Sequence, residues 1–386
     1  MKRSLLILGL IAAVTTAFLL FRPSTAAVTT NAALESLLID DGRSAGFARA
    51  LTPGAIEFPR DLGPHDDFQT EWWYYTGNLE GADGRLFGYQ FTIFRRALTP
   101  DAAPVDDASP WRANQVYLAH FALSDIANGD FYAYERFSRG AAGLAGAQAS
   151  PYRVWLEDWQ VAEIAPGRTR IQAVADEVAL DIVLTETLPP VLHGDRGLSV
   201  KGAEPGNASY YYSIVRQQVS GSVTVRGARV PVTGLSWKDH EYSTSALSPG
   251  AVGWDWFSLQ LDNGTGLMFF QIRRDDGTLE PASSGSFILA DGTVRHLDRA
   301  GWELEVLDTW TSPTSGAVYP AGWRIAIPAI GLELRGAPLM ANQELNLTTV
   351  YWEGAVEFRG ALNGAPVTAR GYIEMTGYAG SMDGRL

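Results

Sequence analysis

Apolar and polar residues follow one another in short runs along most of this chain. From Phe58 onward, apolar and aromatic runs are bounded by Gly, Asp, Asn and Pro. Runs of this kind predict β-strands separated by turns. The clearest of them cover residues 86–94, 115–123, 178–185, 210–215, 267–272 and 355–358. Before Phe58 the spacing changes: Leu34, Leu37 and Leu38 recur at a helical interval and predict a short amphipathic helix over residues 31–50.

One run is aromatic at every position. Trp72, Trp73, Tyr74 and Tyr75 follow a segment that contains one histidine and three acids, His65, Asp66, Asp67 and Glu71. In an extended strand, successive side chains point to opposite faces, so Trp72 and Tyr74 share one face and Trp73 and Tyr75 the other. A strand that is aromatic on both faces needs cover on each. Two interpretations stay open, a packed opening strand and a binding or catalytic surface.

The same pattern occurs twice in the chain. The run that begins at Trp72 matches the run that begins at Trp254, position by position through Leu79 and Leu261. A second match joins residues 221–228 to 354–361, and Trp237-Lys-Asp239 then falls near Tyr372-Ile-Glu374. Two matches in the same order indicate two diverged copies of one β domain.

Each copy opens with an aromatic strand and closes with an antiparallel one. Pairing of the last strand with the first removes exposed edges, as in up-and-down barrels. The sequence therefore predicts an all-β fold of two tandem antiparallel barrels with a short N-terminal helical arm. The expected divisions are a targeting segment (1–27), the arm (28–57), a first domain (58–245) and a second (246–386). Residues 71–75 and 237–242 are expected to form one patch.

Composition narrows the function classes. The net charge of −13 disfavours nucleic acid, whose phosphates need a basic surface. The absence of cysteine excludes disulfides and thiol catalysis. No two histidines stand at metal-ligand spacing and the acids form no calcium loop, so no metal is expected.

The first residues read as a targeting segment. Lys2-Arg3 precede an apolar run from Ser4 to Phe21, and Ser24-Thr25-Ala26 form a small-residue cleavage site. The run is long enough that an uncleaved membrane anchor stays open. Export without cysteine favours a periplasmic or secreted protein.

Three motifs together resemble the AttH-like / carotenoid 1,2-hydratase family. They are His65-x-Asp67-Phe68-x-Thr70-Glu71-Trp72-Trp73-Tyr74-x-Thr76-Gly77, Ala119-His120-Phe121-Ala122-Leu123-Ser124-Asp125 and Ser236-Trp237-x-Asp239-His240-Glu241-Tyr242. The segments from Tyr351 and Gly371 resemble the second domain of that family, so the resemblance spans residues 58–380. It implies two lipocalin-like (calycin) barrels and an extended apolar ligand, an isoprenoid or a lipid. The motif of the hydratases has Asn and Trp where this chain has Glu241 and Tyr242.

The resemblance also implies a chemistry, the addition of water to an isolated C=C without a cofactor. A carboxylic acid protonates the alkene, aromatic faces stabilise the cation and a positioned water captures it. The implied catalytic candidates are Asp239, His240 and Glu71. The implied ligand contacts are Trp72, Trp73, Tyr74, Trp237, Glu241, Tyr242, Trp254, Trp256, His65 and His120.

Three alternatives stay open beside the hydratase. Asp239-His240-Glu241 can instead be a hydrogen-bonded corner that pins the closing strand. The protein can be a non-enzymatic lipid carrier or an accessory factor of an inner-membrane export system. A secreted hydrolase is disfavoured because no G-x-S-x-G motif occurs. His193 and His296 have no motif support, and the sequence leaves the oligomeric state open.

Overall fold

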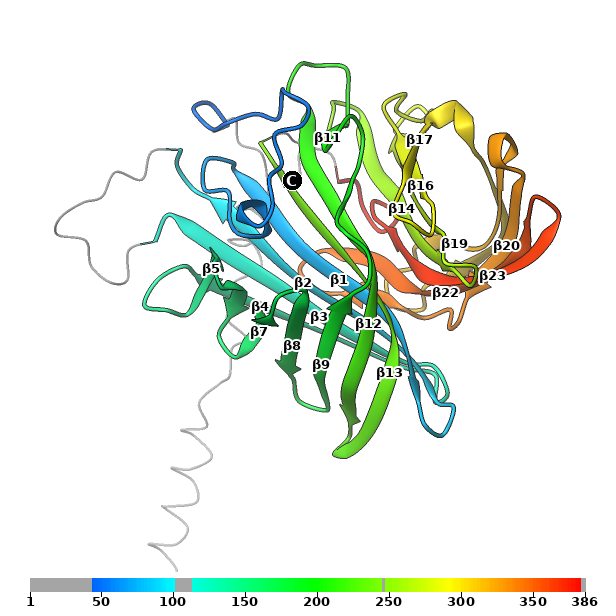
Figure 1. The fold of residues 1–386 in the computed structure, drawn as a ribbon, viewed down its shortest axis with the longest axis horizontal. Helices are drawn as coiled ribbons and strands as arrows, with labels where there is room; N and C mark the ends of the chain where they lie inside the picture. Colours follow the sequence, from blue (N-terminus) through cyan, green and yellow to red (C-terminus); the bar gives the residue numbers. More distant parts are fainter. Residues whose placement is uncertain (1–43, 101–112, 245–246, 383–386) are drawn as a thin grey trace, which may run out of the picture. The chain divides into compact units, whose positions relative to one another are not determined.

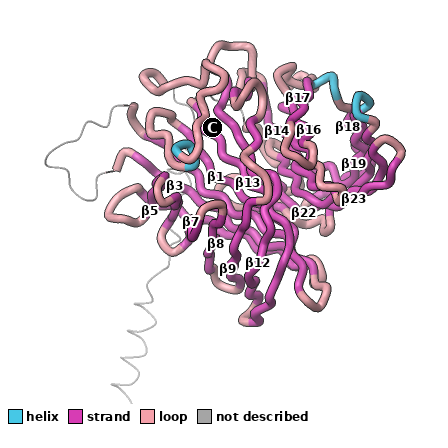
Figure 2. Tube along the Cα trace, viewed as in Figure 1, coloured by secondary structure: helices cyan, strands magenta, loops and turns pink. Residues whose placement is uncertain are grey.

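The computed structural model describes residues 44–100, 113–244 and 247–382, and these form an all-β fold, as predicted. Strands dominate Figure 2. The helical segments of the described residues are short 3-10 turns at Arg60–Leu62, Arg299–Gly301 and Pro328–Ile330. Within the described ranges, no helix has the length and apolar character to cross a bilayer. The predicted arm is not helical over residues 44–50, which form turns and irregular backbone. The predicted targeting segment and the rest of the arm before residue 44 lie outside the described residues.

The first sheet contains thirteen antiparallel strands in the order β4-β3-β2-β1-β13-β12-β9-β8-β7-β6-β5, with β10 and β11 also paired to β12. It curls so that β3 and β4 approach β5 and β6. The strands are β1 (Thr70–Gly81), β2 (Leu86–Ala97), β3 (Gln115–Asp125), β4 (Asp130–Arg139), β5 (Ala145–Ala149), β6 (Tyr152–Leu156), β7 (Trp159–Ala165), β8 (Arg168–Val174), β9 (Val178–Glu186), β10 (Val191–Leu192), β11 (Leu198–Val200), β12 (Ala208–Val225) and β13 (Ala228–Ser243).

The second sheet contains ten strands in the order β17-β16-β15-β14-β23-β22-β20-β19-β18, with β21 paired to β22 (Figure 1). No pairing joins its end strands within the part of the chain that the structure describes, so it is a half-barrel. The strands are β14 (Ala251–Leu261), β15 (Gly266–Arg274), β16 (Ser284–Ile288), β17 (Val294–Asp298), β18 (Glu303–Thr311), β19 (Val318–Ile327), β20 (Leu332–Pro338), β21 (Glu344–Asn346), β22 (Val350–Leu362) and β23 (Ala365–Met375).

The two opening strands pair with the two closing strands, as the repeat predicts. Tyr74 of β1 lies opposite Asp239 of β13, and the matched residue Trp256 of β14 lies opposite Glu374 of β23. The aromatic alternation is confirmed as well. Tyr75 and Trp73 belong to the core inside the first sheet, whereas Tyr74 belongs to a separate apolar cluster that includes residues of both sheets.

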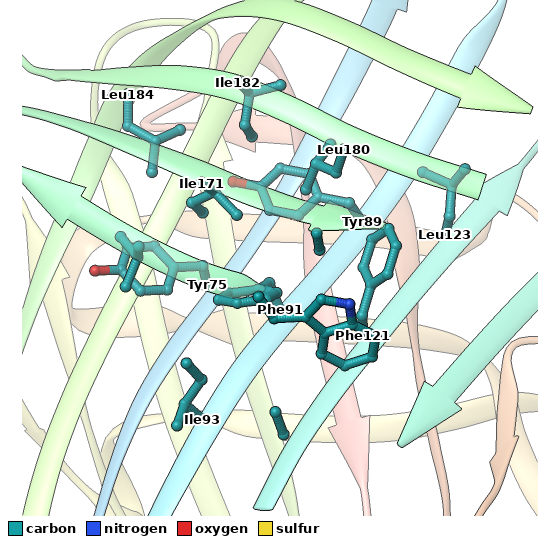
Figure 3. Close-up of a cluster of buried hydrophobic side chains, with 14 of the residues drawn as sticks. Tyr75, Tyr89, Phe91, Ile93, Phe121, Leu123, Ile171, Leu180, Ile182 and Leu184 are labelled. Carbon is teal, nitrogen blue, oxygen red and sulfur yellow. The ribbon is translucent and has the colours of Figure 1, made fainter. Parts of the chain in front are cut away.

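Each sheet encloses its own apolar core. Inside the first sheet, the rings of Tyr75, Tyr89, Phe91 and Phe121 pack against aliphatic side chains from β8 and β9 (Figure 3). Burial of so many large side chains is the main favourable contribution to folding, at about 25 cal/mol per Å² of apolar surface. The second sheet has an equivalent core that includes Phe257, Phe269 and Trp323.

The sheets contact each other through matched residues. The Tyr74 and Trp256 rings meet edge to face with their centroids 5.3 Å apart. The Asn78 side-chain amide donates to the Gly371 carbonyl (3.1 Å), and the matched Gln260 amide donates to the Ser236 carbonyl (2.9 Å). The two copies therefore face each other with local two-fold pseudo-symmetry, and the residues between them come from both copies.

Candidate functional site

The central motif of β13 divides between two faces. Because side chains alternate along a strand, Asp239 and Glu241 point toward the second sheet, and His240 points into the first. Glu71 also lies on the inner side, where it accepts a hydrogen bond from the His240 Nε2 (2.7 Å). Residues 71–75 and 237–242 lie side by side as expected, but they do not form one patch, because Glu71 and His240 lie on the opposite face from Asp239.

The inner group, called here the histidine cluster, consists of Asp61, His65, Glu71, Arg95, Tyr212 and His240. One Glu71 oxygen lies 2.7 Å from a ring nitrogen of each histidine. Its other oxygen accepts from the Arg95 Nε at 2.8 Å. The Tyr212 hydroxyl lies 2.8 Å from His240 Nδ1, on the far side of that ring. Both carboxylate oxygens of Glu71 are thus hydrogen-bonded to protein groups.

Electrostatics in the histidine cluster favour an ionised Glu71 and a neutral His240. Burial alone raises the pKa of Glu71, but Arg95 and the two histidines hold it well below its usual range. Burial lowers the pKa of His240 to about 4, against the opposing effect of Glu71. His240 therefore donates from Nε2 to Glu71 and accepts at Nδ1 from Tyr212.

Three groups of this cluster are close enough to hold a metal ion. Ligand atoms of His65, Glu71 and His240 all lie within 4.8 Å of one another, a convergence that sequence spacing did not reveal. A divalent cation there would stand beside the buried Arg95 guanidinium and compete with it for Glu71. We therefore assign these groups to a hydrogen-bond network that ties the 3-10 turn and the segment before β1 to β13.

The outer group, called here the acid cluster, consists of Asp239 and Glu241 from the first sheet and Glu353 and Glu374 from the second. Asp239, Glu241 and Glu353 are buried, and Glu374 is partly buried. Glu241 pairs with the Lys201 amine at 3.0 Å and also accepts from the Ser209 hydroxyl. Within the described residues, no cation pairs with Asp239, Glu353 or Glu374. Buried carboxyls without a counter-ion resist ionisation.

Asp239 is held by three donors. The Trp237 indole N–H donates to Oδ1 at 2.7 Å, the Ser213 hydroxyl donates to the same oxygen, and the Tyr211 hydroxyl donates to Oδ2 at 2.9 Å. Tyr211 in turn accepts from the Trp256 indole of the second sheet (3.0 Å). Burial raises the pKa of Asp239 to about 7 although these hydrogen bonds oppose the rise. The group is a carboxylic acid poised to exchange a proton near neutral pH.

The second sheet contributes a matched acid. Glu374 occupies the position equivalent to Asp239 and accepts from the Trp254 indole N–H at 3.0 Å. Burial and the nearby Asp239 and Glu241 raise its pKa to about 8, although the Trp254 hydrogen bond opposes the rise. Burial and Glu374 also raise the pKa of Glu353 well above its usual range. The Tyr74 hydroxyl lies near Glu353, yet neither carboxyl oxygen of Glu353 has a partner of normal hydrogen-bond geometry.

A histidine without motif support also reaches the acid cluster. His193 follows β10, and its Nε2 lies 2.6 Å from the Ser213 hydroxyl oxygen while its Nδ1 lies 2.9 Å from the Ser286 hydroxyl. Burial, Lys201 and His296 lower the pKa of His193 to about 3, so the ring is neutral. Ser286, His193, Ser213 and Asp239 form a continuous hydrogen-bonded line from β16 to β13.

The remaining sequence candidates divide between the same two faces. Trp72 and Trp254 join the apolar cluster between the sheets, together with Tyr74, Trp237 and Trp256. Trp73, Tyr242 and His65 lie inside the first sheet, where Tyr242 stacks on His65 at 3.5 Å between ring centroids. His120 binds the Tyr351 hydroxyl (2.8 Å) between the sheets, away from the histidine cluster.

Five residues of the acid cluster and its surroundings were not among the candidates from the sequence. Glu374 was signalled by its repeat position and Glu353 by its place in the segment from Tyr351, whereas Tyr211 and Ser213 stand beside a motif strand and carry no signal of their own. His193 comes from a segment that reads as a turn, so only the folded chain reveals it.

Comparison with known proteins supports the architecture. The family model described as AttH-like matches residues 49–378. No curated protein matched the chain.

Among solved structures, a proposed AttH from Nitrosomonas europaea is 37% identical, with a TM-score of 0.76 over 86% of this chain and 100% of that one. Kievitone hydratase from Nectria haematococca is 16% identical, with a TM-score of 0.64 over 87% and 97%. CghA with Sch210972 is 12% identical, with a TM-score of 0.51 over 87% and 98%. The last two likenesses concern the fold alone. Two facing lipocalin-like sheets, the three motifs and the match over most of the chain lead to one conclusion: this protein belongs to the AttH-like family.

Proposed function

We propose that this protein is a cofactor-independent hydratase that adds water to an isolated C=C of an extended apolar molecule, an isoprenoid or a lipid. The observation that carries the proposal is Asp239, a buried carboxyl with a pKa of about 7 and a mainly aromatic surround. Alkene protonation needs such an acid, because its efficiency is greatest when the catalytic pKa lies near the working pH. Kievitone hydratase has the same fold, so the fold is compatible with a hydratase.

In the proposed reaction, the Asp239 proton transfers to one alkene carbon and leaves a tertiary cation on the other. Ring faces of Tyr74, Trp237 and Trp256 stabilise that positive charge. A water molecule then adds to the cation and loses a proton to Asp239, so that the net change is the addition of H and OH. The three donors on Asp239 stabilise its carboxylate during the interval between the two proton transfers.

The order in which Asp239, Ser213 and His193 contact one another argues against the hydrolase alternative. A serine, a histidine and an acid do meet there, but Ser213 lies between the other two. In a hydrolytic triad the acid binds the histidine and orients its ring. Here the second ring nitrogen of His193 faces Ser286, so Asp239 cannot act on it in that way.

The test uses squalene and an acyclic carotenoid as probes in water enriched in oxygen-18. We expect a product heavier by one labelled water, and the Asp239→Asn variant should lose at least about 100-fold in rate. Asp255→Asn is the matched control: Asp255 is a buried acid of β14 bonded to Arg273 and Tyr378, outside the acid cluster. Full turnover by the Asp239→Asn variant would refute the proposal. An inactive wild-type protein that retains a lipid in native mass spectrometry would support the carrier alternative instead.

We also propose that the protein works outside the cytoplasm, in the periplasm or secreted, with its N-terminal segment removed or kept as a tether. The basis is the positive, apolar and small-residue order of residues 2–26. Cell fractionation together with the mass of the mature N-terminus tests this. A full-length chain in the cytosol would contradict it, and co-purification with an inner-membrane permease would support an accessory role in export.

A further inference from the structure

Lysine is rare in this chain, and its placement is unusual. Of the 30 basic residues, 27 are arginine, and the lysines are Lys2, Lys201 and Lys238. Both lysines in the described ranges pack over aromatic rings rather than standing on an open surface. Arginine stays charged at any physiological pH, whereas a buried lysine can lose its proton and act as a nucleophile. A lysine at positions 201 and 238 therefore allows a chemistry that arginine does not.

Lys238 points into the first sheet, on the face opposite to Asp239. Its Nζ lies 4.5 Å from the ring centre of Tyr152, 5.5 Å from that of Tyr212 and 5.7 Å from that of Tyr75. Its hydrogen bond is a long one, 3.5 Å to the Tyr212 hydroxyl, and no described carboxylate lies within ion-pair distance. The ring faces attract an ammonium, but its three N–H groups find only this one long hydrogen bond, so loss of the proton costs little hydrogen bonding. Burial lowers the pKa of Lys238 to about 7 although Glu186 opposes the shift.

Polar groups without partners stand beside Lys238. Gln217 is fully buried, and neither its amide oxygen nor its amide nitrogen has a hydrogen-bond partner. The strand register places Gln217 opposite Ser236 of β13 on one side and opposite Glu186 of β9 on the other. Ser236 binds the core residue Tyr89 and stands two residues from Lys238, so these side chains share the inner face. Buried polar groups are nearly always satisfied in folded proteins, so both polar atoms of Gln217 are open to an ordered water or to a polar group of a ligand.

From this placement we propose that the interior of the first sheet is a second binding site, in which Lys238 captures an aldehyde or a ketone as a reversible imine. This site, called here the lysine site, consists of Lys238, Tyr75, Tyr152, Tyr212, Gln217 and Glu186. A neutral carbonyl compound fits better than an anion. The carboxyl groups of Glu186 and Glu163 lie near each other at this end of the sheet, and their negative charge repels an anion. The Gln217 amide supplies a donor and an acceptor for a polar group of the same ligand.

Imine formation balances with the residues present. The Lys238 nitrogen attacks the carbonyl carbon, and one N–H proton passes to the oxygen. The carbinolamine then loses its hydroxyl group and the second N–H proton together as water, which leaves a C=N bond. The Tyr212 hydroxyl, within 3.5 Å of the nitrogen, is placed to pass the protons. That hydroxyl is hydrogen-bonded to His240 Nδ1 at 2.8 Å, and the other ring nitrogen of His240 is hydrogen-bonded to Glu71. The histidine cluster thus acquires a role in positioning Tyr212.

The experiment treats the full chain with octanal and sodium cyanoborohydride at pH 7.5, then maps the alkylated peptides by mass spectrometry. We expect the adduct on Lys238, formed at least about ten-fold faster than on the same residue in urea, because an ordinary lysine is almost fully protonated at this pH. The rate should level off above about pH 7.5 in the folded protein and keep rising in urea. The Lys201→Arg variant should keep the adduct and Lys238→Met should lose it, with circular dichroism to verify that each is folded.

Labelling of Lys201 and the amino terminus without Lys238 in the folded protein, while urea exposes Lys238 to labelling, overturns the proposal. So does Lys238-dependent binding of octanoate that is tighter than that of octanal, since the site would then be one for anions. Asp239→Asn should leave the adduct unchanged because the two sites lie on opposite faces of β13. The outcome is therefore independent of the proposed hydratase function.

Discussion

Replacing Asp239 by asparagine tests whether a buried carboxyl keeps its proton near neutral pH. The folded-state pKa is about 7 and the ordinary value is 3.8. Between these two pH values the native protein holds a proton that the unfolded chain has lost, so the free energy of unfolding falls as pH rises. The fall is about 1.4 kcal/mol per pH unit and about 4 kcal/mol in total, and it is complete above pH 7. Asparagine cannot titrate and lacks this contribution.

The assay is urea unfolding of both proteins from pH 4 to pH 9, followed by tryptophan fluorescence. The wild type should lose about 4 kcal/mol relative to Asp239→Asn between pH 4 and pH 7, after which the two curves run parallel. Ser213→Ala removes a donor that lowers the pKa of Asp239, so the decline should extend to higher pH. Parallel curves over the whole range would show that Asp239 is ionised at neutral pH, and the general-acid role would then be refuted.

Three further predictions concern other parts of the fold. Arg95→Met should cost about 3–5 kcal/mol of unfolding free energy, because Glu71 is left buried without its cation; Glu71→Gln in the same background should recover part of it, and no recovery would contradict the pairing. Asn78→Ala should cost about 1 kcal/mol and Gln260→Ala about 2 kcal/mol, since Asn78 donates one hydrogen bond between the sheets and Gln260 donates two; a larger loss for Asn78→Ala in urea unfolding would argue against these contacts. Zinc added to the protein should leave its melting temperature unchanged because Arg95 opposes a cation in the histidine cluster; a rise that disappears in His240→Gln would overturn that assignment.

Much of the fold could be predicted because its signals are local or repeated. The alternation of Trp72 to Tyr75 depends on strand geometry alone, and the pairing of β1 with β13 followed from a matched order of motifs in the two copies. The same repeat placed Glu374 at the position equivalent to Asp239. Strand number and the open ends of the sheets were not predicted, because they depend on long-range pairing between segments of weak pattern.

The candidate site was predicted only in part. The motif from Trp237 to Tyr242 is evident in the sequence, but the prediction of one patch neglects the alternation along β13, which sends Asp239 and His240 to opposite faces. The local sequence of His193 is typical of a turn and carries no sign of a site. Its contact with Ser213 depends on how the segment after β10 folds over β12, which no spacing rule expresses.

The sequence by itself determined the strands, their alternation, the two copies and the residue types available for acid chemistry. Tertiary structure alone decided which of those residues meet and how each one ionises. The reason is physical: a pKa depends on burial and on neighbours brought from distant strands, and neither quantity is local. Asp239 and Lys238 are adjacent in the chain, yet one faces the acids of the second copy and the other faces three tyrosines inside the first.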